Sequence, residues 1–202
     1  MFDDVEELDA VGPWEVLAYW TRTYPEDGFS VMCLSRDGGP VTCAKGLVVG
    51  AHAALAEAPP LVAFVHPGGW GTRALMADEE HLARIRELRA STDIMISVCT
   101  GSLVYAAAGL LPGRPATTHW GSLDSLAAAD PTIQIRPDDR FVDDGDVIIS
   151  AGVSAGIEAP PGTAFGSRIH HTRRVRVLRG RLFSRRGGAL PPRWGEATGP
   201  AS

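Results

Sequence analysis

The sequence predicts an α/β fold, with an open, mostly parallel sheet and helices on both of its faces. Three observations support this fold class. Short apolar runs of strand length alternate with segments of helical spacing between residues 29 and 150. The run at 94–98 is apolar almost throughout, as is typical of a parallel strand buried on both faces. This run places Cys99 on a tight turn before a helix, at the sheet edge where such folds bind ligands.

The first half of the chain contains three strand regions before this run. Residues 29–35 form a strand candidate, and residues 41–49 indicate a hairpin that turns around 44–46. The apolar residues 61–65 predict a buried strand, which leads into a turn at Pro67-Gly68-Gly69.

Helices are predicted between residues 79 and 129. Leu82, Ile85 and Leu88 recur at helical spacing and predict a helix over 79–90, with Asp78 as its N-cap. The other expected elements are a strand at 94–98, helices at 103–111 and 123–129, and a hairpin whose strands, 141–142 and 147–150, flank Asp144-Gly145.

Cys99 lies where a strand meets a helix, a position that offers unpaired backbone N–H groups and the positive end of the helix dipole. Both features favour a thiolate, so we expect the pKa of Cys99 to lie below the ordinary value of about 8.5. A buried structural cysteine is the common alternative. The turn position favours a nucleophile.

Short motifs recur in one order along residues 1–158. They are Leu8-Asp9-Ala10-Val11-Gly12-Pro13-Trp14-Glu15-Val16, Pro67-Gly68-Gly69, Val98-Cys99-Thr100-Gly101-Ser102, Ala107-Ala108-Gly109-Leu110-Leu111, Ala116-Thr117-Thr118-His119-Trp120 and Ser150-Ala151-Gly152-Val153-Ser154-Ala155-Gly156-Ile157. With these motifs the chain resembles the ThiJ/PfpI superfamily, which has the class I glutamine amidotransferase-like fold. Within that superfamily it is most similar to isonitrile hydratases and to the sensor domains of some AraC-type regulators.

The resemblance implies a flavodoxin-like three-layer sandwich with a cysteine nucleophile elbow. It implies a ThiJ/PfpI domain over residues 1–158 and a homodimer. Family members begin with a central strand, whereas only Met1 and Phe2 precede Asp3-Asp4 in this sequence. We therefore expect the first strand to be truncated.

The resemblance also implies that Cys99, Asp9 and Thr100 are catalytic. Asp9 is expected in a loop that faces the cysteine, before a helix that starts at Pro13, although a loop aspartate is more often a solvated turn residue. Thr100 stands where peptidase-like members carry a histidine, which disfavours peptide hydrolysis by a Cys-His pair. A helix cap is the ordinary role of such a threonine.

Four further residues are expected to bind the substrate: Gly68, Gly69, Trp70 and His119. The two glycines let the backbone approach a ligand closely and can present N–H groups beside the Thr100 amide, although a tight turn alone also explains them. For His119 we expect a supporting role in the pocket rather than a catalytic one.

The function implied by the resemblance is hydration of an isonitrile to an N-substituted formamide. The Cys99 thiolate would attack the terminal carbon and form a thioimidate, Asp9 would move protons, and Thr100 with the Gly69 amide would stabilise the intermediate. Two alternatives stay open. One is a ligand-sensing domain related to AraC-type regulators, and the other is a glyoxalase- or deglycase-like enzyme, because one fold hosts many reactions.

Composition places the chain among ordinary soluble domains: 202 residues, of which 45% are hydrophobic. No apolar stretch reaches bilayer length and no signal-peptide pattern opens the chain, so we expect a cytoplasmic protein without a membrane partner. The three cysteines, at 33, 43 and 99, have no zinc-ligand spacing. We expect neither a metal nor a cofactor, and a small molecule as the substrate.

The charge changes abruptly near residue 159. Residues 1–158 carry a net charge of −13, whereas residues 159–202 carry +8, from nine arginines and one glutamate. A basic arm that binds nucleic acid has such a composition. We expect no nucleic-acid partner, because Pro160-Pro161-Gly162 interrupts the long helix that the family has here. The expectation is a frameshifted or disordered tail rich in Arg, Gly and Pro.

Overall fold

The structure is a computed structural model that describes residues 1–152. The expectations for the tail at 159–202 lie outside the described residues, as does the end of the 1–158 domain.

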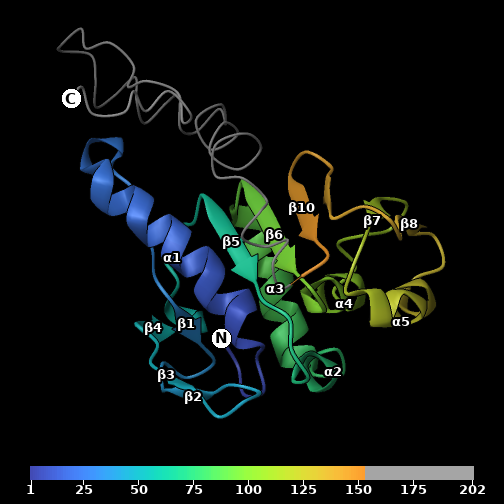
Figure 1. The fold of residues 1–202 in the computed structure, drawn as a ribbon, viewed down its shortest axis with the longest axis horizontal. Helices are drawn as coiled ribbons and strands as arrows, with labels where there is room; N and C mark the ends of the chain where they lie inside the picture. Colours follow the sequence, from blue (N-terminus) through green and yellow to red (C-terminus); the bar gives the residue numbers. More distant parts are fainter. Residues whose placement is uncertain (153–202) are drawn as a thin grey trace, which may run out of the picture. The chain divides into compact units, whose positions relative to one another are not determined.

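A four-stranded sheet lies at the centre of the fold (Figure 1). Its strands are β5 (Ala63–His66), β6 (Ile94–Val98), β9 (Phe141–Asp143) and β10 (Val147–Ser150), in the order β5-β6-β10-β9. β6 runs parallel to both of its neighbours, and β9 joins the edge as the antiparallel half of a hairpin. The predicted α/β class with a mostly parallel sheet is confirmed.

The strand β6 lies at the centre of this sheet because its side chains suit burial on both faces. All five of its residues are buried. On one face, Met95 shares a core with Leu82 and Ile85 of α3 (Glu79–Ser91) and with Leu103 of α4 (Gly101–Ala107). Asp78 caps α3 by accepting the His81 N–H at 3.1 Å, as the sequence predicts.

The first helix, α1 (Glu7–Thr23), differs from the expected one. It begins before Pro13 rather than at it, so Asp9 lies in its first turn and not in a loop. Glu7 and Asp9 suit a helix N-terminus because carboxylates favour the positive end of the dipole. Pro13 lies inside the helix, where it removes one backbone N–H donor and its ring crowds the carbonyl four residues earlier.

Several other boundaries also differ. The strand candidate at 29–35 is reduced to β1 (Leu34–Ser35), and Phe29 instead packs against Trp20, with ring centroids 5.4 Å apart. The helix expected at 103–111 starts directly after the cysteine turn. It ends at Ala107, just before Gly109, whose φ is +76°.

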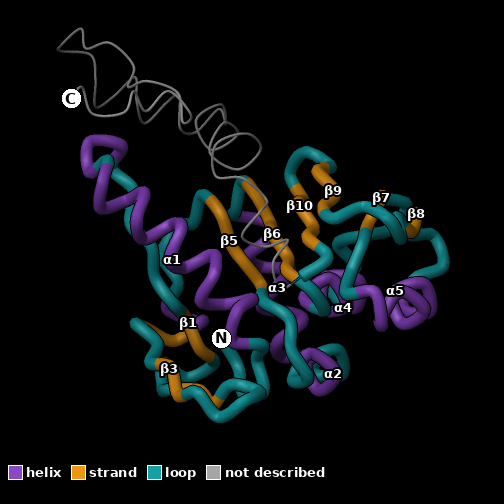
Figure 2. Tube along the Cα trace, in the orientation of Figure 1, coloured by secondary structure: helices purple, strands orange, loops and turns teal. Residues whose placement is uncertain are grey.

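The remaining elements are short and lie around the sheet (Figure 2). The strands are β2 (Val41–Thr42), β3 (Val48–Val49), β4 (Ala53–Ala54), β7 (Pro115–Ala116) and β8 (Gln134–Ile135). The helices are α2 (Thr72–Leu75) and α5 (Leu123–Ala129), with 3-10 turns η1 (Pro25–Asp27), η2 (Leu55–Glu57) and η3 (Trp120–Ser122). The predicted hairpin at 41–49 is confirmed as the antiparallel pair β2-β3.

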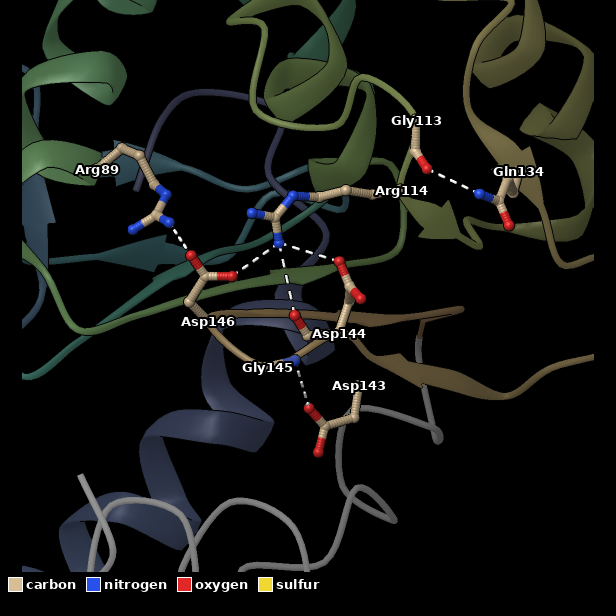
Figure 3. Close-up of polar contacts among 8 residues, drawn as sticks. All are labelled: Arg89, Gly113, Arg114, Gln134, Asp143, Asp144, Gly145 and Asp146. Carbon is tan, nitrogen blue, oxygen red and sulfur yellow. Dashed lines mark hydrogen bonds and ion pairs between the residues drawn. The ribbon is translucent and has the colours of Figure 1, made fainter. Parts of the chain in front are cut away.

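An ion-pair network ties the elements together at the end of the sheet where β10 begins (Figure 3). Asp146 pairs with Arg89 of α3 and, at 2.7 Å, with Arg114, which also contacts Asp144 at 3.0 Å. Cys99 follows the carboxyl end of β6, which is parallel to β10. The network and Cys99 therefore lie at opposite ends of the sheet.

None of the helices between residues 1 and 152 is both long and apolar enough to span a bilayer.

Candidate active site

Cys99 occupies the turn between β6 and α4 in a strained backbone conformation. Its φ is +56°, and Asp4 is the other non-glycine residue with positive φ in the described part of the chain. Such values are uncommon outside glycine and often accompany functional sites. Hydrogen bonds to the backbone of Cys99 hold the turn. The Cys99 N–H donates to the Ser150 carbonyl at 2.9 Å, and the Cys99 carbonyl accepts the hydroxyls of Ser102 and Thr118, both at 3.1 Å.

Glycines surround the thiol because no side chain fits there. A Cβ on Gly152 would lie 2.9 Å from the sulfur of Cys99 and 2.6 Å from its Cβ. A Cβ on Gly101 would meet the His66 carbonyl at 2.4 Å, so Gly101 lets α4 start close to the end of β5. The thiol is consequently enclosed, and Cys99 is 6% exposed.

Gly68 marks the point where the expected catalytic groups meet. A Cβ on Gly68 would lie 2.6 Å from the Thr100 nitrogen, 2.7 Å from the Cys99 Cβ and 2.8 Å from Oδ2 of Asp9. These three atoms come from the start of α4, the end of β6 and the first turn of α1. The fold thus brings Asp9, Cys99, Thr100 and Gly68 together, as the sequence analysis expects.

The pKa of Cys99 is opposite to expectation. Burial, together with the negative charge and hydrogen bond of Asp9, raises it to about 12, whereas the Thr100 N–H acts in the other direction. The prediction of a lowered pKa is therefore wrong for the resting site. Desolvation of the thiol and the carboxylate of Asp9, which is 0% exposed, both raise the pKa of Cys99. Together they outweigh the lowering effect expected from the N-terminus of the seven-residue helix α4. These contacts favour the protonated thiol of Cys99 over the thiolate.

The hydroxyl of Thr100 forms hydrogen bonds with Pro67-Gly68-Gly69, which we call the glycine loop. It accepts the Gly69 N–H at 2.9 Å and lies 3.1 Å from both the Gly69 carbonyl and the hydroxyl of Thr72. The Gly69 N–H is therefore paired with Thr100 in the resting site, and its expected role with an intermediate stays a prediction.

The neighbouring Gly68 amide is different. Gly68 is buried, and within residues 1–152 its N–H donates to no protein acceptor. A buried N–H without an acceptor is rare in folded proteins. Beside a nucleophile it is suited to stabilising negative charge that develops during a reaction.

The other two expected substrate-binding residues are more peripheral. Trp70 is 69% exposed, and the Arg73 guanidinium stacks on its ring at 4.5 Å. The Nδ1 atom of His119 accepts the Gly121 N–H at 3.2 Å and caps η3, and its ring packs against Trp120. Among the described contacts, neither ring bonds to Cys99 or Asp9.

Sequence reasoning missed four residues that shape the site: Thr72, Thr118, Ser150 and Gly152. Thr118, Ser150 and Gly152 all lie in the quoted motifs. The contact of Thr118 with Cys99 could have been inferred from its place next to His119, and those of Ser150 and Gly152 from their place at the end of a strand. Thr72 offers no such signal. It reaches Thr100 through a short helix, α2.

No group of three or more His, Cys, Asp or Glu side chains within residues 1–152 is arranged to hold a metal ion. The three cysteines are free thiols.

The known proteins that are similar to this chain include an enzyme and a transcriptional regulator. An isonitrile hydratase of Pseudomonas putida is 40% identical over 159 residues, which are 78% of this chain and 65% of that protein. The transcriptional regulator CdhR of Pseudomonas aeruginosa is 36% identical over 129 residues, 62% of this chain and 37% of the regulator. The chain thus spans less than two thirds of either relative.

Solved structures agree on the fold. A ThiJ/PfpI family protein from Pseudomonas syringae is 28% identical with a TM-score of 0.67, covering 94% of this chain and 75% of that one. DJ-1beta of Drosophila melanogaster is 18% identical with a TM-score of 0.66, covering 91% and 94%. The family model for DJ-1/PfpI matches residues 1–159. The predicted superfamily is confirmed, and the chain belongs to the DJ-1/PfpI family.

Proposed function

We propose that this protein hydrates an organic isonitrile to an N-substituted formamide, with Cys99 as nucleophile and Asp9 as proton carrier. One observation carries the proposal. The Asp9 carboxylate, the Cys99 side chain and the Thr100 amide converge on Gly68 in a chain that is 40% identical to an isonitrile hydratase.

The first half of the reaction joins the thiol to the substrate. Asp9 takes the thiol proton as the sulfur bonds to the terminal carbon of R–N≡C. That carbon then receives the proton from Asp9, which leaves a thioimidate, R–N=CH–S–Cys99. The raised pKa of Cys99 makes this transfer necessary, because the resting thiol is a poor nucleophile.

The second half releases the product. Water adds to the thioimidate carbon while Asp9 removes one of its protons and passes it to the substrate nitrogen, which gives R–NH–CH(OH)–S–Cys99. The C–S bond then breaks, the hydroxyl proton passes to the sulfur through Asp9, and R–NH–CHO leaves. The Thr100 N–H contacts the thiol, and the Gly68 N–H belongs to a residue packed against the Cys99 side chain, so both groups are candidates to stabilise negative charge in both halves.

The test measures, by chromatography, the release of formamide from a simple aryl or alkyl isonitrile. Formamide that appears with the purified chain and is lost in Cys99→Ala supports the proposal. Consumption of methylglyoxal without formamide release would instead support the glyoxalase- or deglycase-like alternative.

A ligand-sensing role is the second candidate, because CdhR and a regulator of Rhizobium meliloti named GlxA are among the relatives, at 36% and 31% identity. In that case calorimetry would detect binding of an isonitrile or another small molecule without turnover. We further propose a cytoplasmic homodimer, which sedimentation of the purified chain would test.

A further inference from the structure

A pair of buried or partly buried histidines, His66 and His81, lies next to the glycine loop. His66 ends β5 and is 2% exposed, with its ring packed against Phe2, Phe64 and Tyr105. Its Nδ1 lies 2.9 Å from the Pro67 carbonyl, and its Nε2 lies 3.1 Å from Nε2 of His81 in α3. Neither ring is part of the reaction proposed above.

The partners of His66 determine where its proton sits. A carbonyl oxygen only accepts, so Nδ1 must carry the proton and donate it to Pro67. A neutral imidazole then has a bare Nε2, which must accept the Nε2 proton of His81. His66 stays neutral because burial, with a smaller effect of His81, lowers its pKa to about 3.

Among residues 1–152, the contacts of Gly68 and Gly69 leave one of their two N–H groups without an acceptor. The Gly68 carbonyl accepts the Glu6 N–H at 2.9 Å, and the Gly69 carbonyl accepts the Thr72 hydroxyl at 2.7 Å. The Gly69 N–H is bound to Thr100. Only the peptide between Pro67 and Gly68 has its carbonyl held by His66 while its N–H has no protein acceptor among residues 1–152.

The orientation of that peptide fixes the direction of the free N–H. No cis peptide bond occurs in the described chain, and in a trans peptide the C=O and N–H point to opposite sides. A Pro67 carbonyl turned toward His66 therefore turns the Gly68 N–H away from the buried ring. Rotation of this peptide would bury the N–H and direct a carbonyl oxygen the other way, where it would repel negative charge.

We propose that His66 is a positioning residue that holds the Pro67–Gly68 peptide with its N–H available to the reacting group, and that His81 locks His66 in the tautomer that can do so. This inference rests on the proposed function for its kinetic consequence, but not for its structural one.

The test exploits the two amides that mimic the two ring nitrogens. In His66→Asn the side-chain NH₂ can replace Nδ1–H, whereas in His66→Gln it lies near Nε2 and the donor to Pro67 is lost. We expect His66→Gln to lower kcat by about 10- to 100-fold with little change in KM, somewhat less than the loss of an oxyanion donor outright. His66→Asn should keep kcat within a few-fold of the parent. His52→Gln, at a histidine that contacts Cys33 and Trp14, serves as the control.

A second pair of variants decides the matter if His66→Gln does not fold. His81→Gln retains a donor for Nε2 of His66, whereas His81→Leu does not, so only the leucine variant should lose kcat. The proposal would be overturned if kcat fell equally in His66→Asn and His66→Gln, and equally in His81→Gln and His81→Leu. A merely structural role for the two histidines would not distinguish asparagine from glutamine at position 66, or glutamine from leucine at position 81.

A readout without turnover separates this inference from the proposed function. In ¹⁵N-labelled protein, the amide resonance of Gly68 should move in His66→Gln and His81→Leu and stay near its parent position in His66→Asn and His81→Gln. If the parent protein hydrates no isonitrile, the proposed function fails while this pattern still supports the positioning role. Similar movement of the Gly68 resonance in all four variants would refute it.

Discussion

The Asp9 carboxylate has two opposed effects on Cys99. Its charge and hydrogen bond raise the pKa of the thiol, which suppresses the thiolate in the resting site. In the proposed reaction the same carboxylate is the base that takes the thiol proton. Under that proposal the thiol is protected from oxidation and alkylation at rest and is activated only during turnover.

Replacing Asp9 by asparagine should separate these effects. Asp9→Asn removes the charge, so we expect the pKa of Cys99 to fall and its alkylation by iodoacetamide to become faster at neutral pH. Formamide release should fall by about 10²- to 10⁴-fold, because the proton carrier is lost. Mass-mapped labelling against pH measures the first effect. Glu15→Gln, an exposed acid of the same helix, is the matched control, and an unchanged or higher midpoint for Cys99 would contradict the assignment.

Gly68 offers a second test at the level of one residue. In Gly68→Ala the new Cβ would approach the Thr100 nitrogen to 2.6 Å and Oδ2 of Asp9 to 2.8 Å, so the loop must shift away from the site. We expect loss of turnover and a lower melting temperature. In Gly50→Ala, whose Cβ would meet nothing within 4 Å, both should be nearly unchanged. An active Gly68→Ala variant would mean that the loop is not part of the site.

At the level of elements, α3 shows how local chemistry sets a boundary. Asp78 accepts the His81 N–H and also pairs with Arg36 at 2.5 Å, and both contacts lower the pKa of its carboxyl group. The cap and the ion pair can be separated because asparagine caps a helix as well as aspartate does.

Asp78→Ala should therefore lower the free energy of unfolding by about 0.5–2 kcal/mol, mainly through the lost cap. Asp78→Asn keeps the cap and weakens only the exposed ion pair, which is worth about 0–1 kcal/mol. Urea unfolding of both variants measures the difference. Equal destabilisation by alanine and asparagine would assign the stability to the ion pair instead.

Elements with strong local signals were predictable from the sequence. The strand β6, the helix α3 with its cap and the hairpin β9-β10 follow from apolar runs, helical spacing and turn residues. The start of α1 was not, since Pro13 is a favourable first residue of a helix and its place inside one depends on tertiary context.

The proximity of Asp9, Gly68, Cys99 and Thr100 was predictable from the sequence, but their electrostatics were not. The motifs bring Asp9, Gly68, Cys99 and Thr100 together as expected. The pKa of Cys99 depends on burial and on a carboxylate ninety positions away in the sequence, and the pairing of the Gly69 N–H depends on a hydroxyl from another element. Interactions between residues that are far apart in the sequence cannot be read from local sequence patterns.

For the whole molecule, the buried His66 links folding to pH. It is faced by His81 of α3, Tyr105 of α4 and the amino group of Met1, and His81 in turn by Asp78 and Arg36. Its pKa is about 3 in the folded chain against 6.5 normally, so between these values the unfolded state binds the extra proton. Its contribution to stability is complete above pH 6.5 and is lost progressively as the pH falls toward 3.

We therefore expect acid to destabilise the parent protein more steeply than His66→Asn, which lacks this group. The difference in slope should approach about 1.4 kcal/mol per pH unit between pH 6 and pH 4. Urea unfolding at a series of pH values measures it. Parallel stability curves for the two proteins would show that His66 is protonated as readily in the folded state as in the unfolded one.

The hydrogen bond from Cys99 to Ser150, and the place of Gly152 against the sulfur, have a consequence for the timing of synthesis. As the chain leaves the ribosome, β5, β6 and the start of α4 emerge well before β10, which forms the other side of β6. Until β10 docks, the Cys99 N–H lacks its acceptor on Ser150 and the sulfur lacks its contact with Gly152. We therefore expect enclosure of the Cys99 thiol to be among the last steps in the assembly of the sheet.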